Sequence, residues 1–335
     1  MDFSITEFLK IDEICSKWLI SNSNLDSKLE QIYQALIQIN FDPVIKSFTE
    51  RLNSVPYTFT KTEQTSGSIA YFGAIFTSLL NTGKVEEIEG LFTFALCYML
   101  VDHFLDDIKN SEIDKKQTMK ELKDFLIHDI YSDNKLIIAA KDRYLSLISK
   151  NPKVKTSLIR LLESELKGAA ISNNQNLSRE EYKQIAKEKG GRTSSAIAQI
   201  IGIDHDENSP HFICGSLIQY VDDLLDLKDD AELNIYTLAR YDYEHDNLDQ
   251  YIYETILEID QLDSIYNFFK AILMAGVILG VHDNPDSISQ DLLQVLKKYD
   301  PFSKNVSKDS LNDWFHNKLY GYIENKNDLQ IKIQN

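Results

Sequence analysis

The amino-acid sequence predicts an all-helical protein, a single-domain bundle of helices. Three observations predict this class. Apolar residues recur at helical spacing along most of the 335-residue chain, and no run shows the strict alternation of a strand. The chain holds only 6 Pro and 12 Gly, so few segments have the composition of turns between strands. The apolar fraction of 43% is enough for a substantial core, and we treat residues 1–335 as one domain.

The expected helices in the first third of the chain are separated by short polar breaks. Ser21–Asn24 is expected to close a first helix, and Asn53–Pro56 forms a second break. Two helices with apolar faces then follow over 67–80 and 86–107, separated by Asn81–Gly83.

The middle of the chain predicts further helices with recognisable ends. Polar helices are expected over 112–150, and Pro152 suits the first turn of an amphipathic helix that covers 154–171. The stretch Ser178–Glu181 matches a capping box and starts the next helix. That helix carries Gly190–Gly191 in its middle, where we expect a kink or a break. A strongly apolar helix is expected from Pro210 to about Asp230, and others over 246–283, 287–299 and 308–324.

Charge and composition exclude several classes of protein. The formal net charge of −17 argues against non-specific binding to nucleic acid, which needs a basic surface. The N-terminal residues include acids where a signal peptide would have basic residues. The most apolar runs, 91–101 and 271–281, are too short to span a bilayer. The cysteines are Cys15, Cys97 and Cys214, which form no CxxC pair. We expect a cytoplasmic protein with no membrane insertion, disulfide framework or zinc site.

Two clusters of aspartates each follow a strongly apolar helix. The run Leu91–Val101 leads directly into Asp102, Asp106 and Asp107, and the first two of these lie about one helical turn apart. The mostly apolar run Ile213–Val221 ends in a second cluster, in which Asp222, Asp226 and Asp230 step by four residues along one face. Asp223 and Asp229 complete the second cluster.

Clustered carboxylates repel one another unless a cation lies between them. Oxygen ligands of this kind suit Mg²⁺, which combines one or two carboxylates with waters and substrate phosphates. Metal ions would neutralise a departing diphosphate, and aromatic faces could stabilise the carbocation that remains. We expect the two clusters to face each other across an apolar pocket. The candidates for its lining, for each of which ordinary core packing is the alternative, are Phe72, Phe76, Phe94, Tyr98, Phe104 and Tyr220. The alternative for either aspartate cluster is that it marks the point where a core helix reaches solvent.

The paired motifs resemble those of the class I isoprenoid synthase superfamily. The matching residues are Asp102-x-x-x-Asp106-Asp107 and Gln219-x-x-Asp222-Asp223-x-x-Asp226-x-x-x-Asp230, and the resemblance covers about 65–240. Gln219 with the Asp-Asp pair is similar to prenyl diphosphate synthases, whereas the four-residue steps are similar to terpene cyclases. The stretches Lys189–Thr193 and Ala231–Thr237 are similar to the prenyltransferase-like terpene synthases (class IB), which include the bacterial large-terpene synthases.

The resemblance implies a class I isoprenoid synthase-type helical bundle around a central apolar cavity, and it implies roles for further residues. It implies three Mg²⁺ ions, for which Mn²⁺ can substitute, held by both clusters. The broken helix of the family would place a backbone carbonyl of Gly190 or Gly191 towards the reacting carbon. A homodimer is common in the superfamily resembled. Arg192 is placed as the catalytic diphosphate clamp, with a surface ion pair as its alternative. The other diphosphate-binding candidates are Lys187, Lys189, Gln219, Lys228, Arg240 and Tyr241.

The absence of two basic motifs favours a cyclase. Chain-elongating synthases carry Arg-Arg-Gly just after the first motif and Gly-Lys-x-x-Arg near the start. Here Asp107 is followed by Ile-Lys-Asn-Ser, and Gly83-Lys84 continues as Val-Glu. A second diphosphate would therefore lack basic partners. We expect an Mg²⁺-dependent terpene synthase that cyclises one prenyl diphosphate, most simply farnesyl diphosphate to a sesquiterpene, although longer chains stay open. The alternatives are a trans-prenyl diphosphate synthase that uses isopentenyl diphosphate, and a non-catalytic helical scaffold.

Overall fold

The structure is a computed structural model of the 335-residue chain. It describes residues 10–14, 48, 50–55, 57–82, 88–106, 112–128, 130, 135–171, 177–203, 207–263 and 267–298. Within these ranges the regular elements are all helices and no strand occurs, which confirms the all-α prediction. None of the described helices is both long and apolar enough to cross a membrane. The isoprenoid synthase type of bundle stays a prediction.

The chain divides into two compact units, which are described separately. The first unit comprises Met1–Phe41, Ser172–Lys187 and Ser216–Asn335. The second comprises Asp42–Ile171 and Glu188–Gly215. Helices α9 (Arg179–Ile200) and α10 (Pro210–Leu225) each contribute one end to each unit. The single domain expected from the sequence stays a prediction.

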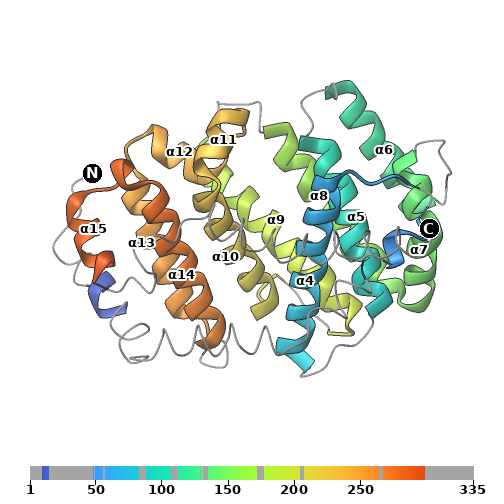
Figure 1. The fold of residues 1–335 in the computed structure, drawn as a ribbon, viewed down its shortest axis with the longest axis horizontal. Coiled ribbons are helices and arrows are strands. Elements are labelled where there is room, and N and C mark those ends of the chain that lie inside the picture. The colour runs from blue at the N-terminus through green and yellow to red at the C-terminus, as the bar shows by residue number, and fades with distance from the viewer. Residues whose placement is uncertain are drawn as a thin grey trace, which may run out of the picture. The chain divides into compact units, whose positions relative to one another are not determined.

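The second unit is built around α5, which is buried on nearly all sides. Helix α4 packs along α5, which also contacts α7 and α8, and α6 packs on α8 (Figure 1). Residues Leu91–Val101 of α5 are buried apart from two half-buried positions, as expected for a helix that is apolar all round. The helices of this unit are α4 (Lys61–Thr82), α5 (Ile88–Asp106), α6 (Glu112–His128), α7 (Lys135–Lys150) and α8 (Pro152–Ile171).

The first unit packs the end of α10 against the C-terminal helices. Helices α13 and α14 lie side by side (Figure 1). A Cβ atom on Gly276 or Gly280 of α14 would meet the side chains of Val221 and Leu224, respectively, so these glycines let α10 approach closely. The remaining elements are α11 (Leu227–Leu233), α12 (Leu238–Glu244), α13 (Leu248–Gln261), α14 (Asn267–Asp283), the 3₁₀ turn η3 (Pro285–Ser287) and α15 (Gln290–Lys297).

Two predicted helix starts are confirmed at the level of individual residues. Pro152 is the first residue of α8. An N–H group at this position would have no partner within the helix, so the proline costs no hydrogen bond. The capping box is formed, because the Ser178 backbone N–H donates to Glu181 Oε2 at 2.8 Å and the Glu181 N–H faces Ser178 Oγ at 3.4 Å. Hydrogen bonds from the Ser178 backbone N–H and then from its hydroxyl lower the pKa of the exposed Glu181 carboxyl. The predicted break at Asn53 is present as a turn.

The predicted break at Gly190–Gly191 is absent, because α9 runs unbroken from Arg179 to Ile200, and the alternative of a kink stays a prediction. A Cβ atom on Gly191 would lie 2.6 Å from the ring of Phe212, and one on Gly215 would collide with the Gly190 carbonyl oxygen. The glycines therefore allow close helix packing within the second unit, and α9 keeps its hydrogen bonds.

Other differences are smaller. The helix expected to run from Pro210 to about Asp230 is divided at Asp226, and the short helix α12 was not expected. The expected segments Ser21–Asn24 and 308–324, together with Pro56 and Gly83, lie outside the described residues.

Candidate aspartate clusters and apolar cavity

The first aspartate cluster lies at the C-terminal end of α5. The helix continues through Asp102 and ends at Asp106, one turn later. The side chains of both residues, and the whole of Asp107, lie outside the described part of the chain. The apolar helix therefore delivers the first two aspartates to its end as the sequence predicts, and the direction of their carboxylates stays a prediction.

The second cluster keeps its four-residue steps although the helix bends within it. Asp226 stands between α10 and α11 with φ −93° and ψ 3°. The backbone N–H of Asp226 still donates to Asp222 O, and that of Asp230 to Asp226 O, each at 2.8 Å. Asp222 is exposed, whereas Asp226 and Asp230 are half-buried. One turn before Asp222, Ile218 is 46% exposed, so an apolar side chain leads into the row of carboxylates.

Asp223 differs from its neighbour Asp222 because it points inwards. It is only 5% exposed, and its Oδ1 accepts a hydrogen bond of 2.8 Å from Gln219 Nε2. Burial first, and then the negative charge of Asp223, raise the pKa of Tyr251 well above its ordinary value. The fold thus brings two of the predicted site residues, Gln219 and Asp223, together as hydrogen-bond partners.

The chemistry of these donors suits a hard cation, but the described side chains alone do not complete a site. Among the described residues, no group of three or more His, Cys, Asp or Glu side chains could hold a metal ion. Carboxylate oxygens are nonetheless the protein ligands that Mg²⁺ prefers, and Mg²⁺ takes several of its ligands from water and substrate phosphate. The second cluster could therefore supply only part of a coordination shell.

Arg192, the expected diphosphate clamp, is engaged by the protein. Its Nη2 forms an ion pair with Glu207, and its guanidinium lies 5.3 Å from the ring centre of Phe212. The Arg192 side chain is 16% exposed and that of Glu207 is 63% exposed. The aromatic ring fixes the guanidinium, and an exposed carboxylate covers its donors.

The three lysines of the predicted diphosphate site have different surroundings. Lys189 Nζ lies 3.7 Å from Glu165 Oε2. Lys187 is exposed, and its carbonyl oxygen accepts a 2.9 Å hydrogen bond from Ser216 Oγ. Lys228 donates to the main-chain oxygen of Asp283, the last residue of α14. That contact indicates a role in holding a helix end.

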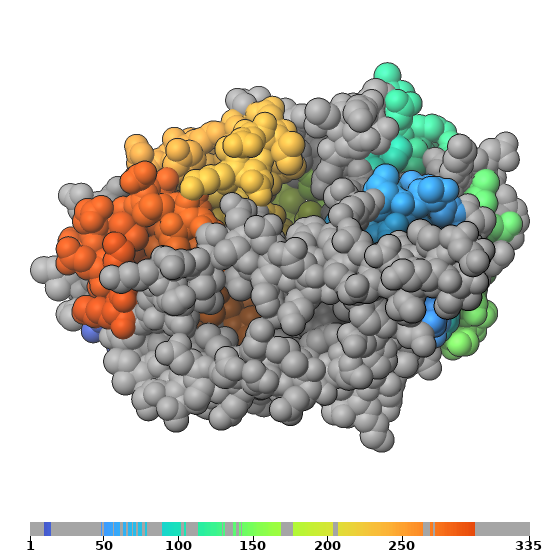
Figure 2. Space-filling model, in the orientation of Figure 1, coloured from blue at the N-terminus to red at the C-terminus, as the bar shows by residue number. Residues whose placement is uncertain are grey.

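Arg240 also holds a helix end. Although α11 and α12 lie at the surface (Figure 2), Arg240 is only 8% exposed. Its guanidinium donates to Glu244 at 2.9 Å, to Ile235 O at 3.0 Å and to Asp230 O at 3.3 Å. Tyr241 stacks on His245, the residue that follows α12, with ring centres 4.1 Å apart. These contacts indicate a structural role for the Arg-Tyr pair.

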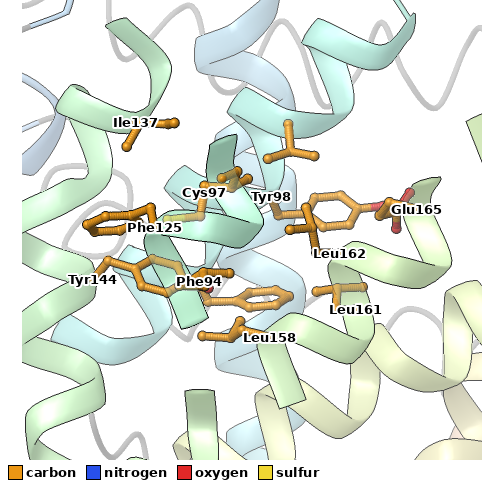
Figure 3. Close-up of a pocket in the computed structure, with 13 residues that line it drawn as sticks. Phe94, Cys97, Tyr98, Phe125, Ile137, Tyr144, Leu158, Leu161, Leu162 and Glu165 are labelled. Atoms are coloured by element: carbon orange, nitrogen blue, oxygen red, sulfur yellow. The ribbon is translucent and has the colours of Figure 1, made fainter. Parts of the chain in front are cut away.

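An apolar cavity of about 50 Å³ lies within the second unit (Figure 3). Residues from α5, α6, α7 and α8 line it at helical spacing. Two of the predicted pocket residues, Phe94 and Tyr98, are among them, and their rings stack with centres 6.0 Å apart. Glu165 is the one residue with a carboxyl group among the described lining residues. The lining residues are Phe94, Cys97, Tyr98, Val101, Leu122, Phe125, Leu126, Ile137, Tyr144, Leu158, Leu161, Leu162 and Glu165.

The other predicted pocket residues lie elsewhere or are not described. Phe104 is half-buried and packs against the core of the second unit without lining the cavity. Tyr220 belongs to the first unit, where it is buried with its ring centre 6.4 Å from that of Tyr251. The side chains of Phe72 and Phe76 lie outside the described residues. Since the two aspartate clusters belong to different units, their facing arrangement stays a prediction.

A buried ion-pair network in the first unit was missed from the sequence. Arg179 Nε donates to both oxygens of Asp242, at 2.8 and 3.0 Å, and Asp242 is fully buried. Arg179 and Lys183 also reach Glu254. Burial alone would raise the pKa of Glu254, but hydrogen bonds from Gln250 and these two cations outweigh it, so the pKa lies below its ordinary value. The sequence alone places only Arg179 and Lys183 close together, one helical turn apart, because their acidic partners are distant in sequence.

Comparison with known proteins leaves the family open: no family model, no curated protein and no solved structure matches this chain.

Proposed function

We propose that this protein is a class I terpene synthase that ionises a linear prenyl diphosphate and cyclises the resulting carbocation. Farnesyl diphosphate is the preferred substrate and a sesquiterpene the product. The observation that carries the proposal is the row Asp222, Asp226 and Asp230, kept in four-residue steps by the backbone and preceded by the exposed Ile218. This row places carboxylates at the end of an apolar helix face, which suits a substrate with a hydrocarbon body and an anionic head.

In this proposal, different residues of the chain have different roles. Asp102, Asp106 and the second cluster would hold Mg²⁺, which when bound supplies the Lewis acid that neutralises the departing diphosphate. Arg192 would exchange Glu207 for the diphosphate, to which its forked donors are well matched. The stacked rings of Phe94 and Tyr98 would stabilise positive charge through their faces, and the apolar lining of the cavity would keep water away. The proposal requires both clusters to act on one diphosphate.

A prenyl diphosphate synthase is the second candidate, and the hydrogen bond between Gln219 and Asp223 favours it. That pair belongs to the part of the second motif that resembles chain-elongating enzymes. Against it stands the absence of arginines after Asp107, where a second diphosphate would need them.

Product analysis separates the candidates. The full-length protein is incubated with Mg²⁺ and geranyl, farnesyl or geranylgeranyl diphosphate, with and without isopentenyl diphosphate. Diphosphate release and gas chromatography–mass spectrometry are the two readouts. A cyclase releases diphosphate and forms a terpene without the co-substrate. A longer diphosphate that forms only with isopentenyl diphosphate would instead establish the synthase.

The aspartate row is tested with a matched pair of variants. We expect Asp226→Asn to lower diphosphate release by about 100-fold or more, because a metal ligand is lost. Glu232→Gln is the control, because it removes an exposed carboxylate from α11, the short helix that follows Asp226, at a position outside the four-residue row. Mg²⁺ with inorganic pyrophosphate should also raise the melting temperature of the wild type by mass action. If both variants behave as wild type and pyrophosphate gives no shift, the chain is a non-catalytic scaffold.

A further inference from the structure

Among the described lining residues of the apolar cavity, Glu165 is the one that carries a carboxyl group. The three other lining residues on α8 are all leucines, and Glu165 continues the helical spacing of Leu161 and Leu162 (Figure 3). It is 6% exposed. Burying a carboxylate is costly unless it is paired, so a buried acid in an otherwise apolar lining needs a specific explanation. We propose that Glu165 accepts the proton that ends the cyclisation, an inference that rests on the proposed function.

The surroundings of Glu165 suit a proton acceptor. Lys189 Nζ lies 3.7 Å from Glu165 Oε2, which is close enough for charge attraction but longer than a hydrogen bond. The ammonium group favours the ionised carboxylate, while the apolar lining removes the water that would otherwise solvate it. The phenol of Tyr98 points towards the carboxylate (Figure 3). An ionised carboxylate has about four acceptor positions, so it can meet a lysine and still accept a proton.

Two other ion pairs of the second unit serve as a comparison for the pair of Glu165 and Lys189. Glu163, two residues away on α8, pairs with Lys123 at 2.5 Å, and its side chain is 45% exposed. Lys167 pairs with Glu188 at 2.8 Å, and the lysine is 58% exposed. Each of these pairs has at least one exposed member and a hydrogen-bonding distance, and neither lines the cavity. The pair of Glu165 and Lys189 differs in all three respects.

The proposed step is a simple deprotonation. A carbon atom next to the cationic carbon of the cyclised intermediate loses a proton to a Glu165 oxygen. The electron pair of the broken C–H bond becomes the π bond of the product alkene, and the carboxylate becomes a carboxylic acid. Once the product leaves, that acid returns its proton to water. No oxidant, reductant or second substrate is needed.

The test compares Glu165→Gln with the control Glu163→Gln in the full-length protein, with Mg²⁺ and farnesyl diphosphate. Diphosphate release measures ionisation, and gas chromatography–mass spectrometry measures the share of hydrocarbon and alcohol. We expect Glu165→Gln to release diphosphate within about threefold of the wild-type rate, and to raise the ratio of alcohol to hydrocarbon by about tenfold or more, because an amide cannot accept the proton. Glu163→Gln should give the wild-type product ratio.

Glu165→Asp distinguishes the loss of the proton acceptor from a change in the shape of the cavity. It shortens the side chain but keeps the carboxylate, so we expect hydrocarbon to stay the main product. If the glutamine variant does not fold, Glu165→Met replaces it with an apolar side chain of similar length and the same expected shift.

Each failure has a distinct signature. Unchanged product ratios in Glu165→Gln, or an equal loss of hydrocarbon in the glutamine and aspartate variants, would overturn the inference and leave the proposed function standing. A wild type that forms only alcohols would do the same. A wild type that releases no diphosphate from any of the prenyl substrates would overturn both.

Discussion

Arg192 cannot give the same donors to Glu207 and to a diphosphate, so the two anions compete for it. In the structure Glu207 holds Arg192 Nη2 from the exposed side, and Phe212 lies against the guanidinium. Replacing Glu207 with Gln removes the competing charge and leaves the aromatic support in place. We therefore expect Glu207→Gln to bind pyrophosphate more tightly than the wild type does.

The expected gain follows from the exposure of the pair. Glu207 is 63% exposed, and an ion pair with so exposed a partner contributes on the order of 0–1 kcal/mol. Since about 1.4 kcal/mol corresponds to tenfold in affinity, the substitution should tighten binding by up to about fivefold. Salt screens exposed charges, so the gain should shrink when the ionic strength rises.

Isothermal titration calorimetry with inorganic pyrophosphate and Mg²⁺ measures this gain directly. Arg192→Gln should weaken binding, and Glu207→Gln should give no further gain in that background. Glu188→Gln is the control, since Glu188 pairs with Lys167 rather than with Arg192. Equal affinities for Glu207→Gln and wild type would refute the competition. So would a gain that persists without Arg192, because it would then arise from general charge repulsion.

Three further predictions concern stability and reactivity. Gly215→Ala should destabilise the fold by about 3 kcal/mol or more in chemical denaturation, because the added methyl group would collide with the backbone. Gly168→Ala is the control and should be neutral or slightly stabilising, because its methyl group would meet nothing within 4 Å. Equal effects of the two substitutions would refute the packing argument. The folded-state pKa of Glu254 is depressed from 4.5, so its stabilising contribution is full above that value and is lost as pH falls through the folded pKa; Glu254→Gln should flatten the acid limb of a stability–pH curve. Burial raises the pKa of Cys97 and of Cys214 to about 12, so neither should react with iodoacetamide at pH 8 unless the protein is unfolded, which mass spectrometry of labelled peptides would check.

Local sequence patterns predicted the helices well because each pattern has one dominant physical cause. Helical recurrence of apolar residues located α5, α8 and α10 to within a few residues. Pro152 and the Ser178–Glu181 pair marked helix starts, since both act on backbone groups within the same turn.

Gly190–Gly191 was misjudged because glycine in a helix has two explanations that a single sequence does not distinguish. Glycine can weaken the helix, or it can admit a close neighbour. The deciding facts are the ring of Phe212 and the position of Gly215, both more than 20 residues away along the chain. The buried pair of Arg179 and Asp242 was missed for the same reason, since its partners meet only after folding.

The candidate diphosphate groups can now be ranked by what each would lose on leaving its present partner. Arg240 donates to two main-chain oxygens that end or follow α11, and Lys228 to one that ends α14, so moving either would leave helix-end carbonyls without those donors. Arg192 would leave only an exposed carboxylate, which water can solvate. Of these three cations, Arg192 therefore loses the least on exchange. Replacing Arg240 should lower the melting temperature before it changes pyrophosphate affinity, whereas replacing Arg192 should do the reverse.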